Sequence, residues 1–210
     1  MPQASTRRHA AAARPGGSSS LPRPRGIIAA DFLHLDTALG KRLYASAFLE
    51  HGTRRPHITD VTTHPTREWT AQQARNLAAD LEHRMESLRF LLRDRDDKYA
   101  QAFDAVFQAD DMRVITSAPR TPRMNAHCER VVGSLRREAL DHVLIMGEAH
   151  ARQVLKTYES HYNRHRSHQA RDQLPPEVQE GPTAAHDLET HRLLRARIPG
   201  GLINEYRHAA

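Results

Sequence analysis

Arg93-Asp94-Arg95-Asp96-Asp97-Lys98-Tyr99 follows a short apolar run, residues 88–92, and precedes a helical and then a strand-like segment. A second distinctive stretch, residues 119–130, reads Pro-Arg-Thr-Pro-Arg-Met-Asn-Ala-His-Cys-Glu-Arg and places one carboxylate, Glu129, on an arginine-rich helix. Asp31 is another isolated carboxylate, on an earlier apolar strand. Mg²⁺ prefers oxygen ligands and keeps open positions for phosphate oxygens. Carboxylates drawn from distant segments therefore suggest metal-dependent phosphoryl chemistry on nucleic acid.

The segments around these carboxylates predict an α/β domain. Before position 65, three short apolar runs, 27–35, 43–49 and 57–63, are separated by turn residues and predict an antiparallel meander. After Pro65 the apolar spacing becomes helical over 66–85, with Thr66 as the expected cap. Further elements alternate: strand 88–92, a helix around Phe103, strand 112–116, and helices from 125 and 148. We expect a mixed five-stranded sheet with helices on both faces, followed by a helical C-terminal extension.

Composition divides the 210 residues into three parts. Residues 1–25 contain five arginines, no acid and a Gly-Gly-Ser-Ser-Ser run, which predicts a disordered basic tail. The core is expected over 26–166 and the extension over 167–210. Residues 111–171 carry a net charge of +5, whereas 26–110 and 172–210 each carry −2, so the positive charge surrounds Glu129.

Other features of the composition bear on the cellular context. The single cysteine, Cys128, excludes an internal disulfide and indicates a reducing compartment, so a cytoplasmic location is expected. No apolar stretch reaches the length of a membrane span, and no membrane partner is expected.

The order of the elements, with Asp on the first strand, Asp after the fourth and Glu on a later helix, resembles a known family. It is similar to the ribonuclease H-like catalytic core of Asp-Asp-Glu transposases and retroviral-type integrases, and most of all to bacterial insertion-sequence transposases. The resemblance covers roughly residues 26–206. The resemblance rests on these short sequence motifs: Ala30-Asp31-Phe32, Arg42-Leu43-Tyr44, residues 69–76, Arg93-Asp94-Arg95-Asp96, Asn125 with Glu129-Arg130, Leu135-Arg136-Arg137-Glu138, residues 162–166, and Gly200-Gly201-Leu202-Ile203 with Glu205-Tyr206.

The resemblance implies a chemistry and a set of partners. Asp31, Asp94 and Glu129 would be the catalytic residues and would hold two Mg²⁺ or Mn²⁺ ions for cleavage and strand transfer of double-stranded DNA. A homo-oligomer on DNA is also implied. The positive charge near Glu129 predicts a track for the phosphate backbone, formed by Arg120, Arg123, Arg130, Arg136 and Arg137.

Each assignment has an alternative. Asp36 competes with Asp31 for the first carboxylate, and Asp96 and Asp97 compete with Asp94 as members of a solvated acidic turn. Glu129 could be an exposed helix residue paired with Arg130. His161 and His165 share a helical face and raise the question of zinc, but no His-Glu-x-x-His pattern or cysteine cluster accompanies them.

Two other functions are compatible with the same sequence motifs. The usual N-terminal helix-turn-helix region of these transposases is replaced by the basic tail, which would suit a DNA-binding remnant that no longer recombines DNA. A ribonuclease H or Holliday-junction nuclease shares the fold, but residues 135–166 look more like a transposase.

Overall fold

The computed structural model describes residues 26–117, 125–178, 193–198 and 201–208 of the 210-residue chain. The predicted tail, residues 1–25, lies outside these ranges. The strands and helices, in chain order, are β1 (Ile27–Asp36), β2 (Arg42–Glu50), β3 (Pro56–Thr62), α1 (Arg67–Leu81), β4 (Phe90–Arg93), α2 (Gln101–Gln108), β5 (Arg113–Thr116), α3 (Ala126–Glu138), α4 (Glu148–Arg164), β6 (Leu193–Ile198) and β7 (Ile203–His208). Short 3₁₀ turns cover Glu82–Ser87, Leu140–His142 and Gln169–Arg171.

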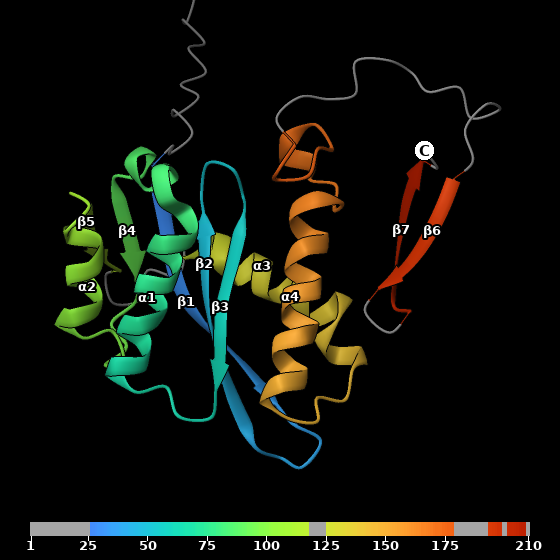
Figure 1. Ribbon diagram of the computed structural model, residues 1–210, viewed down its shortest axis with the longest axis horizontal. Helices are drawn as coiled ribbons and strands as arrows, with labels where there is room; N and C mark the ends of the chain where they lie inside the picture. Colours follow the sequence, from blue (N-terminus) through green and yellow to red (C-terminus); the bar gives the residue numbers. More distant parts are fainter. Residues whose placement is uncertain (1–25, 118–124, 179–192, 199–200, 209–210) are drawn as a thin grey trace, which may run out of the picture.

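The central sheet has five strands in the order β3-β2-β1-β4-β5 (Figure 1). The first three strands are antiparallel neighbours, as short turns between consecutive strands require, and β4 and β5 run parallel to β1 because helices connect them. The predicted mixed five-stranded sheet and its meander are confirmed.

Helices cover both faces of the sheet, also as predicted. Successive side chains along a strand point to opposite faces of the sheet, so alternate residues of β1 belong to two different hydrophobic cores. Ile28 and Ala30 pack in one cluster with residues of α1 and α2, such as Leu77 and Phe103. Leu33 and Leu35 pack in a second cluster with residues of α3 and α4, and Figure 1 shows α4 running alongside β3.

The start of α1 matches the sequence expectation, but its end does not. Thr66 caps the helix, and its hydroxyl oxygen accepts a hydrogen bond from the Trp69 amide at 3.1 Å. The predicted helix over 66–85 ends as α-helix at Leu81, because Glu82 has a positive φ of 44° and cannot continue the right-handed helix. Met85 is still buried in the 3₁₀ turn that follows, which explains why the apolar spacing continued beyond the helix.

The predicted helical extension at the C-terminus is wrong for the part of it that the structure describes. β6 and β7 form a two-stranded antiparallel hairpin, and only the 3₁₀ turn at Gln169–Arg171 is helical there. The sequence signal for the hairpin is Pro199-Gly200-Gly201 between two runs of alternating character. Within the described ranges, no helix is both long and apolar enough to cross a membrane.

Candidate active site

Asp31 and Asp94 lie near enough to interact electrostatically, just beyond the paired parts of β1 and β4. The two strands pair in parallel up to Ala29 and Leu92, and Asp31 and Asp94 each follow two residues later. Residues two apart on a strand share a face. Ala29 and Leu92 pack with Cys128 of α3, so both carboxylates belong to the face that α3 covers.

Hydrogen bonds hold the carboxylate of Asp31 in place. Its Oδ1 accepts from the Phe32 amide at 2.8 Å, and its Oδ2 accepts from the Asn125 side-chain amide at 2.9 Å. Burial, together with repulsion from Asp94 and Glu129, raises the pKa of Asp31 to about 6, although these hydrogen bonds oppose the shift. The three predicted carboxylates therefore share one electrostatic environment.

Glu129 lies in the first turn of α3, and its backbone amide bonds to the carbonyl of Asn125 at 3.1 Å. Cys128, the residue before it, is buried, and its sulfur lies 3.9 Å from the Ala29 carbonyl of β1. Burial raises the pKa of the Cys128 thiol strongly, so it behaves as the small core residue expected from the sequence. The side chain of Glu129 is exposed, and no three His, Cys, Asp or Glu residues of the described chain form a ready-made metal cluster.

Asp94 is fixed through its backbone. Arg93 donates from Nη1 to the Asp94 carbonyl at 2.9 Å and forms a two-pronged ion pair with Asp104 of α2 at 2.8 and 2.7 Å. The Asp94 carboxylate accepts the Asp96 amide at 3.1 Å, which closes the turn after β4.

The competing carboxylates have other partners. Asp36 is exposed and pairs with Arg42 at 3.0 Å. Asp96 pairs with Lys98 at 2.6 Å. Asp97 is exposed. These contacts favour Asp31 and Asp94 as the pair that belongs to the site.

The arginines predicted to contact DNA divide into three groups. Arg130 and Arg137 are exposed on α3, as a phosphate-binding face requires. Arg136 donates to the backbone carbonyl of His34 and so also ties α3 to β1. Arg120 and Arg123 lie outside the described residues.

Several contacts were not expected from the sequence. Asn125 belongs to one of the sequence motifs that carry the resemblance, but no role was assigned to it. In the structure its side chain contacts Asp31. Glu138 at the end of α3 accepts from Arg166 at 2.7 Å and from the Tyr158 hydroxyl at 2.6 Å, which joins α3 to α4. His161 and His165 both contact Glu205 of β7, at 3.0 and 3.4 Å. No local pattern signals these long-range pairs.

Comparisons with known proteins show which proteins this fold resembles. Residues 110–176 match the family described as integrase core domain. A chain of the simian T-cell lymphotropic virus intasome, in complex with the PP2A regulatory subunit B56 gamma, superposes with a TM-score of 0.58 and 13% identity, covering 89% of this chain and 67% of that one. The chain has the fold of an integrase catalytic core.

Other structures agree. The HTLV-2 integrase catalytic core domain in complex with magnesium gives a TM-score of 0.56 at 9% identity, covering 75% of this chain and 97% of that one. The Mos1 transposase catalytic domain with raltegravir and Mg gives 0.53 at 14% identity, covering 64% and 71%. No curated protein sequence matches the chain. The resemblance to integrases and transposases is confirmed for the fold and for the integrase core segment.

Proposed function

We propose that this integrase-type fold is the catalytic core of a transposase or integrase that cuts double-stranded DNA and joins its strands. The observation that carries the proposal is that Asp31, on the face covered by α3, interacts electrostatically with both Asp94 and Glu129, just beyond the last paired residues of β1 and β4. Glu129, in the first turn of that helix, would be the third catalytic residue. The match of residues 110–176 to the integrase core domain supports the same reading.

The donor groups fit a hard divalent cation. Asp31, Asp94 and Glu129 offer oxygen ligands only, as Mg²⁺ and Mn²⁺ prefer. The side-chain oxygen of Asn125 is buried without a hydrogen-bond partner among the described residues, and it lies on the amide that contacts Asp31. The magnesium named with the HTLV-2 and Mos1 structures is consistent with this. When bound, two such ions would activate the attacking hydroxyl and stabilise the leaving oxygen.

The residues of this chain would prepare the site for that chemistry. The Phe32 amide and Asn125 orient the Asp31 carboxylate, and Arg93 fixes the backbone of Asp94. Burial makes the negative charge of Asp31 unfavourable in the absence of a cation, so the site gains more from binding one than an exposed carboxylate would. Arg130, Arg136 and Arg137 would bind phosphates of the DNA, together with Arg120 and Arg123.

Three further parts of the proposal have no direct test in the structure. From the resemblance we expect the chain to act as a homo-oligomer on DNA, and from its single cysteine we expect a cytoplasmic location. The division into a tail over 1–25, a core over 26–166 and an extension over 167–210 stays a prediction.

The test is a DNA nicking and joining assay with Mg²⁺, Mn²⁺ or EDTA. We expect activity only with the metals, and loss of activity in the Asp31→Asn, Asp94→Asn and Glu129→Gln variants, because each removes the charge of a metal ligand and keeps its shape. Asp36→Asn and Asp97→Asn are matched controls that should retain activity. Full activity of Asp94→Asn would refute the assignment.

The alternative is a DNA-binding remnant without catalysis. The exposed side chain of Glu129 and the lack of a ready-made metal cluster in the described chain favour it. Salt-sensitive DNA binding together with inactivity under every metal condition would identify the remnant.

A further inference from the structure

The hairpin formed by β6 and β7 lies beyond α4, on the side of that helix away from the central sheet (Figure 1). One face of the hairpin is turned toward α4. On this face, Ile203 packs against the hydrophobic core that includes residues of α4. Glu205 pairs with His161 at 3.0 Å and with His165 at 3.4 Å. Glu205 is the one carboxylate in the sequence of the two strands, and it is held against the helix by two histidines.

The opposite face of the hairpin is basic and exposed. Arg195 and Arg197 of β6 pair with Tyr206 and Asn204 of β7, and paired residues of an antiparallel ladder share a face. All four side chains are exposed, and Tyr206 keeps 60% of its accessible surface. Because Glu205 belongs to the other face, no carboxylate of either strand neutralises the two arginines.

A groove of about 300 Å³ extends this basic face onto α4. Arg197 and Ile198 line the groove from β6, and the residues that line it from α4 include His150, Gln153 and Thr157. None of the described residues that line the groove is acidic. The basic side chain of Arg197 therefore faces polar but uncharged groups of the helix, and no carboxylate.

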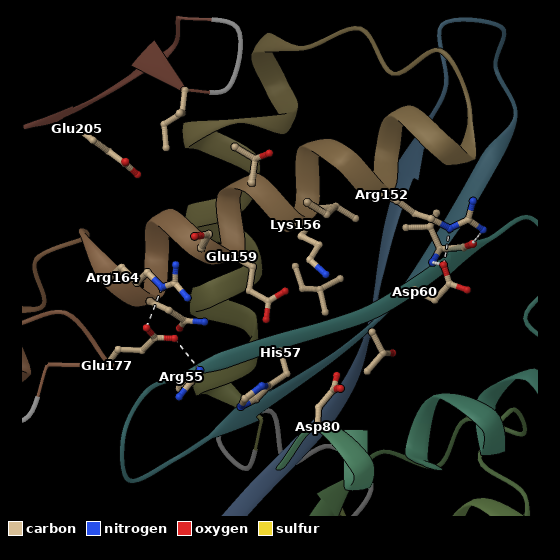
Figure 2. Close-up of a pocket in the computed structure, with 18 residues that line it drawn as sticks. Arg55, His57, Asp60, Asp80, Arg152, Lys156, Glu159, Arg164, Glu177 and Glu205 are labelled. Carbon is tan, nitrogen blue, oxygen red and sulfur yellow. Dashed lines mark hydrogen bonds and ion pairs between the residues drawn. The ribbon is translucent and has the colours of Figure 1, made fainter. Parts of the chain in front are cut away.

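The carboxylates of α4 point away from the groove. Glu148 accepts from the Thr63 amide at 3.0 Å, at the end of β3. Glu159 accepts from the Ile58 amide of the same strand, and Figure 2 shows its side chain pointing toward β3. At about 100° per residue, His150 lies roughly 160–180° around the helix from both glutamates. The helix thus separates an acidic side, which faces β3, from a side without acids, which faces the hairpin.

His150 contributes a neutral hydrogen-bond donor to this side. Its Nδ1 accepts from the Met146 amide at 3.2 Å. With Nδ1 used as an acceptor, the proton of the ring is on Nε2, which is then a donor. The groove therefore combines an uncharged N–H donor with the guanidinium of Arg197. Phosphate oxygens accept hydrogen bonds from both kinds of group.

We propose that Arg195, Arg197, Tyr206 and His150, here called the hairpin surface, bind the phosphate backbone of double-stranded DNA. The choice of DNA as the ligand rests on the proposed function, to which this surface adds a contact separate from the arginines of α3. Charge complementarity supports it, because DNA carries one negative charge per ~1.7 Å of its axis and the two arginines have no carboxylate on their face. Such contacts position the duplex without reading its sequence.

Fluorescence anisotropy of a labelled duplex, titrated with the full chain between about 50 and 200 mM KCl, tests the charged part of the surface. In Arg195→Ala/Arg197→Ala, the affinity should fall by at least about tenfold at the lowest salt. The slope of log K against log salt should become shallower by about 1.8, since each lost phosphate contact removes about 0.9. Arg195→Lys/Arg197→Lys keeps both charges and should retain the wild-type slope. Arg75→Ala/Lys156→Ala removes two exposed charges elsewhere and is the matched control.

His150→Ala tests the neutral contact separately, at pH 8. The affinity should fall about two- to tenfold, the effect of one lost hydrogen bond. The salt slope should stay at the wild-type value, because a neutral donor displaces no counterion. His150→Gln keeps a side-chain N–H donor and should restore part of the affinity. Wild-type affinity in His150→Ala would remove His150 from the hairpin surface.

Wild-type affinity and salt slope in Arg195→Ala/Arg197→Ala would overturn the hairpin surface as a whole. All of the substituted side chains are exposed or only partly buried, so each variant is expected to fold, which circular dichroism verifies. Weakened binding in this variant, together with no nicking by wild type under any metal condition, would support the hairpin surface and overturn the proposed catalysis. Loss of affinity in Arg130→Ala/Arg137→Ala but not in the hairpin variant would leave the α3 contacts as the DNA track and overturn the hairpin surface.

Discussion

Asn125 donates from its side-chain nitrogen to Oδ2 of Asp31 across 2.9 Å, and so connects the start of α3 to the middle of β1. The contact joins residues that are 94 positions apart in the chain. It sets the orientation of a carboxylate whose pKa burial raises to about 6.

Replacing Asn125 should weaken metal binding without unfolding the protein. In Asn125→Ala, the Asp31 carboxylate loses an orienting donor, and we expect Mn²⁺ affinity to fall roughly 10-fold or more, as for other partners of metal ligands. Isothermal titration calorimetry measures the affinity, and thermal unfolding checks the fold. Gln72→Ala on α1 is the control, because it removes an exposed side-chain amide that is distant from Asn125 in the sequence. Equal Mn²⁺ affinity in Asn125→Ala and wild type would show that the contact plays no part in the site.

Asp31→Asn should stabilise the protein in the absence of metal. The pKa of Asp31 in the fold, about 6, is above the ordinary value of 3.8, so the folded state favours the protonated form. The ionised group therefore lowers stability progressively as pH rises from about 3.8 to about 6, and fully above it. At pH 7.5 the variant should unfold with a free energy higher by up to about 3 kcal/mol, because a change of one in pKa corresponds to about 1.4 kcal/mol. Added Mn²⁺ should raise the melting temperature of wild type and leave the variant unchanged; a variant that still responds to Mn²⁺ contradicts this role.

Glu159 should give stability a second pH dependence. Burial raises its pKa to about 7 from an ordinary 4.5, although the Ile58 amide, Lys156 and Arg55 oppose the shift. A raised pKa means that stability falls as pH increases between about 4.5 and 7. Glu159→Gln should remove that part of the decline in urea unfolding measured at pH 5 and pH 8. Glu148→Gln is a control of opposite sign, because the pKa of Glu148 is lowered and its contribution is lost at acid pH instead. An identical decline in Glu159→Gln and wild type would refute the assignment.

The contact between Glu138 and Arg166 should stabilise the packing of α3 against α4. Arg166 donates to both oxygens of Glu138, at 2.7 and 3.0 Å, and its guanidinium lies 5.3 Å from the ring centre of Tyr162. Arg166→Ala should lower the free energy of unfolding by about 1–2 kcal/mol, since charged hydrogen bonds are lost. Arg164 pairs with Glu177 at the surface, so Arg164→Ala should lower the free energy of unfolding by less than about 1 kcal/mol. A double-mutant cycle with Glu138→Gln isolates the pair, and a coupling energy near zero would contradict the prediction.

Local patterns in the sequence were enough for most of the fold. The meander, the change from strand-like to helical spacing of apolar residues after Pro65, and the cap at Thr66 each depend on residues a few positions apart. Local sequence patterns can therefore predict them. Asp31, Asp94 and Glu129 were assigned from the resemblance and from the short motifs around them, and their catalytic role stays a prediction. Where a local signal was overridden, the prediction failed: Glu82 ended α1 early, and residues 193–198 and 203–208 of the extension form a hairpin rather than a helix.

Tertiary structure alone decided how these pieces meet. The sequence does not reveal that Asp31 faces α3, because the face of a strand depends on which helices cover each side of the sheet. Nor does it show that Asn125 bonds to Asp31, or that Glu148 and Asn163 cover opposite ends of β3. Such contacts require two elements to be placed in register across space, and the energy that sets this register comes from the packing of the whole core, not from any local run of residues.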